Sequence, residues 1–138
     1  MIREIVKDTN ILTQKSERFI IGQDDYLIKD MLDTAYAHKD VCAGLACIQI
    51  GIPKRVILVR EGAKFVPYIN PVIVDKTVQT YIAKEGCLSI DGAREVKRHY
   101  GIKLCYHDRK GKTRVITFTG GLAQIIQHEC DHLNGILI

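Results

Sequence analysis

Apolar residues recur at helical spacing in two stretches, one near each end of the chain. In residues 24–39 one apolar stripe follows Asp24, a residue type common at helix N-termini. Its members are Leu27, Ile28, Met31, Leu32 and Ala35. In residues 119–135 Thr119 precedes and Gly135 follows the apolar positions, as at the two ends of a helix. Those positions are Leu122, Ile125, Ile126 and Leu133. The pattern predicts two helices.

Between these helices the apolar residues are β-branched or aromatic and form short runs, which is typical of strands. The runs are Arg55–Arg60, Pro67–Val74, Val78–Ala83, Arg94–Tyr106 and Lys112–Phe118. Two prolines in the second run predict an edge strand or an irregular one. We therefore expect one α+β domain over residues 1–138, with mostly antiparallel sheets packed around the C-terminal helix.

The predicted C-terminal helix carries His128, Glu129 and His132 in the pattern H-E-x-x-H. Histidines four residues apart project from the same side of a helix, one turn apart. They can hold one metal ion while the glutamate handles a proton of the bound water. Paired histidines also occur without a metal, so the hypothesis requires a third ligand.

A third ligand is expected upstream, because the sequence continues for only six residues beyond His132. Cys130 points about 200° away from His128 around the helix, so it is not expected to share the metal. The upstream candidates are Cys42, Cys47, Cys87, Cys105, His38, His99 and His107. Cys87 stands out because the neighbouring Gly86 permits close backbone approach. A buried cysteine without any metal is the alternative for Cys87.

Three separated segments together resemble the peptide deformylase family. They are Gly44–Gly51 (GLACIQIG), Glu85–Ser89 (EGCLS) and Gln127–His132 (QHECDH). The family patterns, in the same order and at similar spacing, are G-x-G-L-A-A-x-Q-x-G, E-G-C-L-S and Q-H-E-x-D-H. The second and third match fully. Cys42 and Cys47 stand where the first pattern usually has glycine and alanine.

The resemblance implies a metal-dependent hydrolase that removes the formyl group from N-formylmethionyl peptides of newly made proteins. The products would be formate and a free amine. The implied ligands of one divalent metal are Cys87, His128 and His132. Glu129 would move the proton of the attacking water. The side-chain amide of Gln49 and the backbone N–H of Leu88 would stabilise the oxyanion.

The substrate is expected to lie beside Gly44 as an added strand, as peptides often do at a sheet edge. Its methionine side chain needs an apolar pocket, for which Ile125 is a candidate, and Gln124 would be a polar group in that pocket. Arg94 is a candidate contact for the peptide, and a surface cation is the alternative.

The ligand set does not by itself identify the metal. One thiolate and two imidazoles favour zinc by their softness. The resemblance implies Fe²⁺, which Ni²⁺, Co²⁺ or Zn²⁺ can replace. Ligand histidines usually donate their second N–H to a carboxylate, and Glu85 and Asp131 are candidates. Asp131 could instead pair with an arginine.

Composition and charge narrow the expected partners and location. The net charge is +4, with 16 acidic residues interspersed among 20 basic ones. No concentrated basic run points to direct DNA binding. Five cysteines without a C-x-x-C pair do not resemble a disulfide framework. No apolar run has the length of a signal peptide or a membrane span. We expect a cytoplasmic enzyme that meets nascent peptides, with transient contact to the ribosome.

Two alternatives remain at this point. A metalloprotease of the H-E-x-x-H kind would share the helix but would need a different third ligand. A deformylase-like protein with altered catalysis could serve for binding, and the departures at Cys42 and Cys47 favour that possibility.

Overall fold

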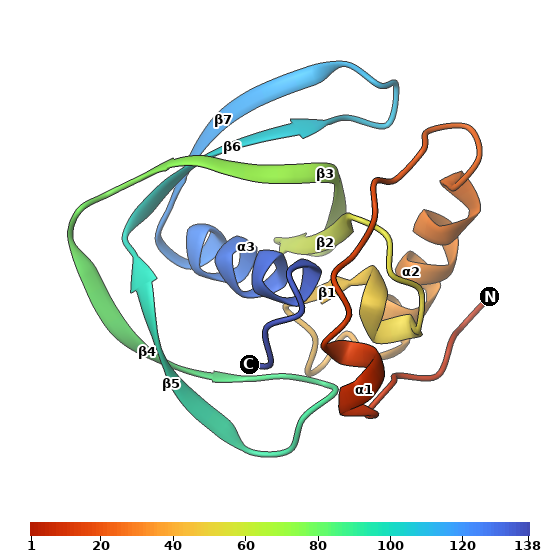
Figure 1. Ribbon diagram of the computed structural model, residues 1–138, viewed down its shortest axis with the longest axis horizontal. Coiled ribbons are helices and arrows are strands. Elements are labelled where there is room, and N and C mark those ends of the chain that lie inside the picture. The colour runs from red at the N-terminus through yellow and green to blue at the C-terminus, as the bar shows by residue number, and fades with distance from the viewer.

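The C-terminal helix α3 (Gly120–Leu133) lies in the middle of the structure, with strands around it (Figure 1). The computed structural model describes residues 1–138. The predicted helix is confirmed, with Thr119 at the N-cap and Gly135 in a left-handed conformation just after the end. The Thr119 side chain makes no capping hydrogen bond. One side of α3 is apolar and belongs to the core, through Ala123, Ile126, Cys130 and Leu133.

The larger sheet has five antiparallel strands in the order β1-β2-β3-β6-β7. These strands are β1 (Gly44–Ala46), β2 (Val56–Glu61), β3 (Lys64–Lys76), β6 (Gly101–His107) and β7 (Thr113–Thr119). The short strand β1 pairs only with β2, so its other edge is free.

Strand β3 is irregular, which confirms the prediction of an edge strand or an irregular one in its second form. It lies between β2 and β6. Its pairing with β6 shifts register between Ile69 and Val72, around Asn70 and Pro71. A bulge at this point accommodates a proline, which has no N–H to donate to the ladder.

A second sheet consists of the hairpin β4 (Thr80–Gly86) and β5 (Ala93–His99). The single strand predicted for residues 94–106 is wrong, because the chain passes from one sheet to the other at Tyr100. Strand β5 pairs with β4, whereas β6 pairs with β3 and β7. The hairpin curls past α3 on the side away from the larger sheet (Figure 1).

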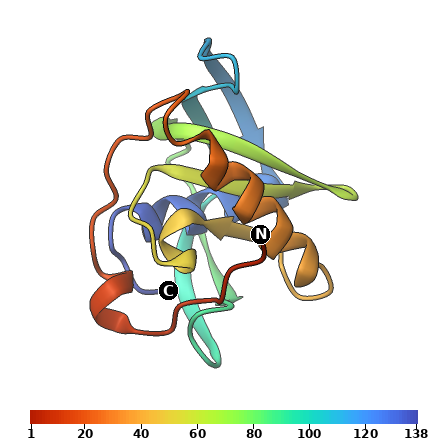
Figure 2. The same ribbon diagram turned by 90° about the vertical axis from the view of Figure 1, so that its right-hand side faces the viewer.

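The helices α2 and α3 cover opposite faces of the larger sheet. Helix α2 (Asp25–Ala37) follows Asp24 as predicted, and lies toward the viewer in Figure 2. In β2, Ile57 and Val59 pack in the apolar cluster beside α3, whereas Val56 and Leu58 pack in the cluster beside α2. This alternation explains why Val56–Val59 are all apolar, since both faces of this part of the strand are buried.

The N-terminal segment includes one short helix, α1 (Thr9–Leu12), and a 3₁₀ turn, η1 (Cys47–Ile50), follows β1. The backbone N–H of Val6 donates to the carbonyl of Gln49. The observed architecture is α+β with antiparallel sheets around the C-terminal helix, which confirms the predicted fold class. None of the helices is long and apolar enough to cross a membrane.

Candidate active site

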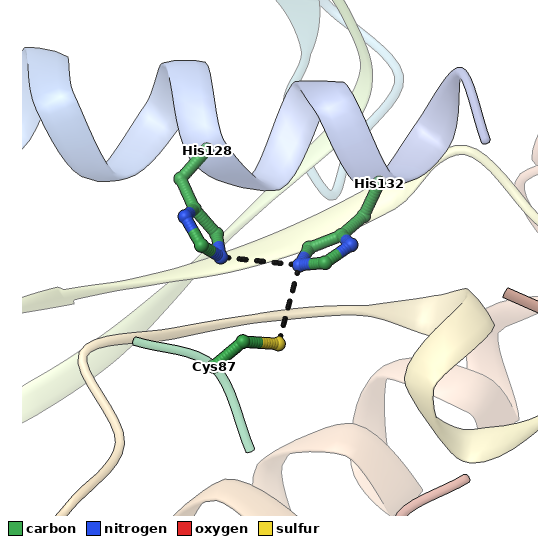
Figure 3. A group of neighbouring side chains, drawn as sticks. All are labelled: Cys87, His128 and His132. Atoms are coloured by element: carbon green, nitrogen blue, oxygen red, sulfur yellow. Dashed lines mark hydrogen bonds between the residues drawn. The ribbon is translucent and has the colours of Figure 1, made fainter. Parts of the chain in front are cut away.

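Two histidines on the polar side of α3 face each other. The Nε2 atoms of His128 and His132 lie 3.1 Å apart, and both residues are buried. Figure 3 shows both rings directed away from the helix toward the same point. Their separation of four residues places them one helical turn apart, as the sequence predicts.

Cys87 approaches the histidines from the segment that follows β4. Its Sγ lies 3.5 Å from His132 Nε2, and the three ligand atoms lie within 4.8 Å of one another (Figure 3). Tetrahedral zinc has bonds of about 2.1 Å to nitrogen and 2.3 Å to sulfur, which place neighbouring ligands about 3.3–3.6 Å apart. The observed 3.5 Å between Cys87 Sγ and His132 Nε2 falls within this range, and the 3.1 Å between the two Nε2 atoms is 0.2 Å below it, so small shifts let the three side chains fit one divalent metal ion.

A buried carboxylate orients the first histidine. Glu85 Oε1 lies 2.7 Å from His128 Nδ1, which leaves Nε2 directed at the other two ligands. Burial opposes ionisation of Glu85, but hydrogen bonds from Arg98 and His128 outweigh it and hold its pKa at about 2. Of the two candidate carboxylates, Glu85 is therefore the one that hydrogen-bonds to a histidine of the site. Asp131 instead pairs with Arg98, at 2.7 Å, which confirms the second option for that residue.

The second histidine is held neutral. Burial and the neighbouring charge of His128 lower the pKa of His132 to about 3. His128 is the opposite case: burial opposes its charge, but hydrogen bonds with Cys87 and Glu85 outweigh burial and raise its pKa to about 10, so binding of a metal ion would displace its proton. A neutral imidazole is the form that binds a metal ion.

Glu129 lies next to these candidate ligands and lines the same cavity. Its Oε1 atom is buried without a hydrogen-bond partner. Burial raises the pKa of Glu129 to about 7, against the nearby charge of His128. A carboxyl group with a pKa near neutrality can both accept and release a proton.

Gln49 reaches the site from η1. Its Oε1 accepts a hydrogen bond from the backbone N–H of Ala46, which fixes the amide. Its Nε2 lies 3.3 Å from Cys87 Sγ and 3.2 Å from Ser89 Oγ. Gln49 and Leu88 both line the cavity, so the donors expected from the sequence lie beside the Cys87 thiol.

A cavity of about 450 Å³ opens over Cys87, His128 and Glu129. The candidate substrate residues Gly44 and Ile125 line it. A Cβ atom at Gly44 would lie 2.8 Å from Glu129 Oε2 and 2.9 Å from Ile125 Cγ2, so only glycine fits there.

Arg94 is not among the residues that line the cavity, and its Nη1 atom is buried without a partner. Cys42 lines the cavity near Gly44, and its Sγ lies 3.3 Å from the Gly44 carbonyl. Cys47 is buried in the apolar cluster beside α2. Both departures from the family pattern are therefore small buried side chains, and neither displaces a proposed ligand.

Two residues of the site were not predicted from the sequence. Arg98 binds Glu85 through two hydrogen bonds and is almost fully buried. Tyr81 donates to Gln124 at the cavity. Both are on the β4–β5 hairpin, directly opposite each other in the strand pairing. The pairing of β4 with β5 brings both residues toward α3. The local sequence around each residue does not predict this pairing.

Comparison with known proteins gives matches over the whole fold. The sequence model of the polypeptide deformylase family matches residues 2–138. The peptide deformylase of Clostridium beijerinckii is 44% identical over 138 residues, which is all of both chains. That of Pelagibacter ubique is 39% identical and covers 99% of this chain and 83% of its own.

Solved structures agree with the sequence relatives. A class I type b peptide deformylase from Acinetobacter baumannii, with Met-Ala-Ser bound, superposes with a TM-score of 0.89 at 28% identity. The match covers 99% of this chain and 97% of that one. Peptide deformylase from Ehrlichia chaffeensis superposes with a TM-score of 0.89 at 32% identity. This match covers 99% of this chain and 86% of that one. Sequence, fold and site together place this chain in the polypeptide deformylase family.

Proposed function

We propose that this chain is a peptide deformylase, a metal-dependent hydrolase that removes the formyl group from N-formylmethionyl peptides. One observation carries the proposal. Cys87, His128 and His132 converge within 4.8 Å beside the carboxyl group of Glu129, at a cavity large enough for a peptide end.

We propose Cys87, His128 and His132 as the ligands of one divalent metal ion. A bound ion would act as a Lewis acid and lower the pKa of water toward about 7. One thiolate and two imidazoles suit Fe²⁺, Co²⁺, Ni²⁺ and Zn²⁺ better than Mg²⁺ or Ca²⁺. We propose Fe²⁺ as the metal in the cell, with the other three as replacements.

Glu129 is the proposed proton carrier. Its carboxylate accepts one proton from the water that attacks the formyl carbon, and then delivers that proton to the departing nitrogen. The C–N bond breaks, formate leaves and the peptide keeps a free amine. During the attack, the formyl oxygen gains negative charge. The amide of Gln49 and the backbone N–H of Leu88 are the proposed donors to it.

The substrate backbone is proposed to pair with the free edge of β1. That edge borders the cavity through Gly44, where only a glycine leaves room beside Glu129. Ile125 contributes an apolar wall for the methionine side chain. The A. baumannii enzyme that superposes on this chain holds Met-Ala-Ser. Arg94 stays a proposed contact for the backbone or C-terminal side of the peptide, which would extend beyond the cavity that Arg94 does not line.

We further propose that the partners are nascent peptides, met in the cytoplasm during transient contact with the ribosome, and that the protein does not bind DNA directly. All five cysteines are free thiols, and a reducing compartment keeps Cys87 available as a ligand.

Formate release from formyl-Met-Ala-Ser tests the proposed function. The protein is loaded anaerobically with Fe²⁺, or in air with Ni²⁺, and compared with Glu129→Gln. We expect Glu129→Gln to keep its metal and to lose about 10³-fold in kcat. The exposed Glu95→Gln is the matched control and should behave as wild type. Absence of formate from metal-loaded, folded wild type would refute the assignment.

Metal content separates this function from that of a protease with another third ligand. Cys87→Ser should lose bound metal, whereas Cys105→Ser should keep it. Metal retained by Cys87→Ser at the wild-type level would rule out the proposed ligand set.

A further inference from the structure

Gln124 is a polar side chain in the wall of the cavity over the proposed metal site. Gln124 lines the cavity together with Val41, Ala43, Leu88 and Ile125. It is four residues before His128 on α3. Side chains four residues apart share one face of a helix, so Gln124 lies one turn from the proposed metal ligand on the same side.

The amide of Gln124 is held in one orientation. Its Oε1 accepts a hydrogen bond of 2.9 Å from the hydroxyl of Tyr81 on β4. The Tyr81 ring packs against Tyr100, with centroids 4.7 Å apart, which restricts the phenol. Because the acceptor end of the amide is occupied, the Nε2 group is the end that remains for the cavity. It makes no hydrogen bond within the protein.

Gln124 lies at a distance from His128 that would let its amide donate a hydrogen bond to the end of the first substrate side chain. Four residues of helix span about 6 Å along the axis. In a formyl-methionyl peptide, five bonds of about 1.5 Å separate the formyl carbon from the sulfur, so an extended side chain covers about the same distance. A formyl group beside His128 and Glu129 therefore brings the sulfur level with Gln124.

This inference rests on the deformylase function proposed above. We propose that Gln124 is a specificity-determining residue, whose side-chain amide donates a hydrogen bond to an acceptor near the end of the first substrate side chain. The preferred substrates carry such an acceptor, namely the thioether of methionine or the stronger sulfoxide of oxidised methionine. Tyr81 acts as a positioning residue, because it holds the amide with its N–H groups toward the cavity.

The strength of the acceptor sets the size of the effect. A thioether is a weak acceptor, so the amide should favour methionine over its apolar isostere norleucine only by about threefold. A sulfoxide oxygen is strong, and burying it without a donor carries a penalty equivalent to roughly tenfold or more in kcat/KM. The sulfoxide peptide is therefore the sensitive probe.

The experiment compares formyl-Met-Ala-Ser with the same peptide carrying norleucine or methionine sulfoxide in the first position. The readout is the ratio of kcat/KM for the sulfoxide peptide to that for the norleucine peptide. We expect Gln124→Leu to lower this ratio about tenfold and Tyr81→Phe to lower it about threefold. Ile82→Thr, an exposed change beside Tyr81, is the matched control and should leave the ratio as in wild type.

Ratios within twofold of wild type in both Gln124→Leu and Tyr81→Phe would overturn the proposal. The affinities of the three unformylated peptides, measured by calorimetry, give the same ratios without turnover. An inactive wild type would refute the proposed deformylase function, and the affinity ratios would still decide the role of Gln124.

Discussion

Replacing Arg98 with methionine tests the buried network that orients His128. The guanidinium donates to Glu85 from Nε at 2.9 Å and from Nη2 at 2.7 Å, and its Nη1 donates to Asp131 at 2.7 Å. Methionine has a similar length but neither charge nor donors. Arg98→Met therefore leaves the Glu85 carboxylate buried with only the His128 ring as a partner.

The expected loss follows from how deeply each partner is buried. The side chains of Arg98 and Glu85 are 5% and 6% exposed, and removing one member of such a pair costs about 3–5 kcal/mol. The Asp131 side chain is 25% exposed, so its contact contributes less than about 1 kcal/mol. We expect Arg98→Met to lower the free energy of unfolding by about 4 kcal/mol in total, which lowers the Tm by roughly 12 °C for a chain of this size.

Urea unfolding at pH 7 measures this loss, with a chelator present throughout so that metal binding does not contribute. Arg114→Met is the matched control, because Arg114 pairs with Asp108 at 3.1 Å with its side chain 49% exposed. Its expected loss is below about 1 kcal/mol. Equal losses for Arg98→Met and Arg114→Met would refute the reasoning.

Three further outcomes are expected. Gly44→Ala should lower kcat/KM for formate release roughly a hundredfold, because the new Cβ displaces the Glu129 carboxylate; near-normal kinetics would contradict this. Gly135→Ala should lower the free energy of unfolding by about 2–3 kcal/mol, since Gly135 has a φ of +76° and its Cβ would collide with the Thr13 carbonyl. An unchanged urea midpoint would exclude that collision. A chelator should lower the Tm of the metal-loaded wild type but not that of Cys87→Ser, and equal shifts in both would argue against Cys87 as a ligand.

The central helix and its histidines could be predicted from the sequence because their signals are local. Apolar spacing defines the buried side of α3, and the same helical period places His128 and His132 together. The approach of Cys87 is different, since 41 residues separate it from His128. The neighbouring Gly86 singled it out among seven candidates, and the match to three family segments then selected it as a ligand.

The hairpin that completes the site could not be predicted in the same way. Arg98 stands in the run Glu95–His99, whose many charged residues resemble a solvent-exposed strand. It is buried because its partners Glu85 and Asp131 come from other elements. The break at Tyr100 also has no strong local signal, because the separation of β5 from β6 depends on which sheet each strand joins.

The position of α3 in the chain has a consequence for how the protein is made. All seven strands precede this helix in the sequence, yet the core on one face of the larger sheet is completed by it. During synthesis the strands leave the ribosome first, with that apolar face uncovered. Cys87 also emerges well before the two histidines. A chain that still lacks α3 therefore has neither a finished core nor the full set of proposed metal ligands, so closing the core and assembling the proposed metal site both depend on the same helix.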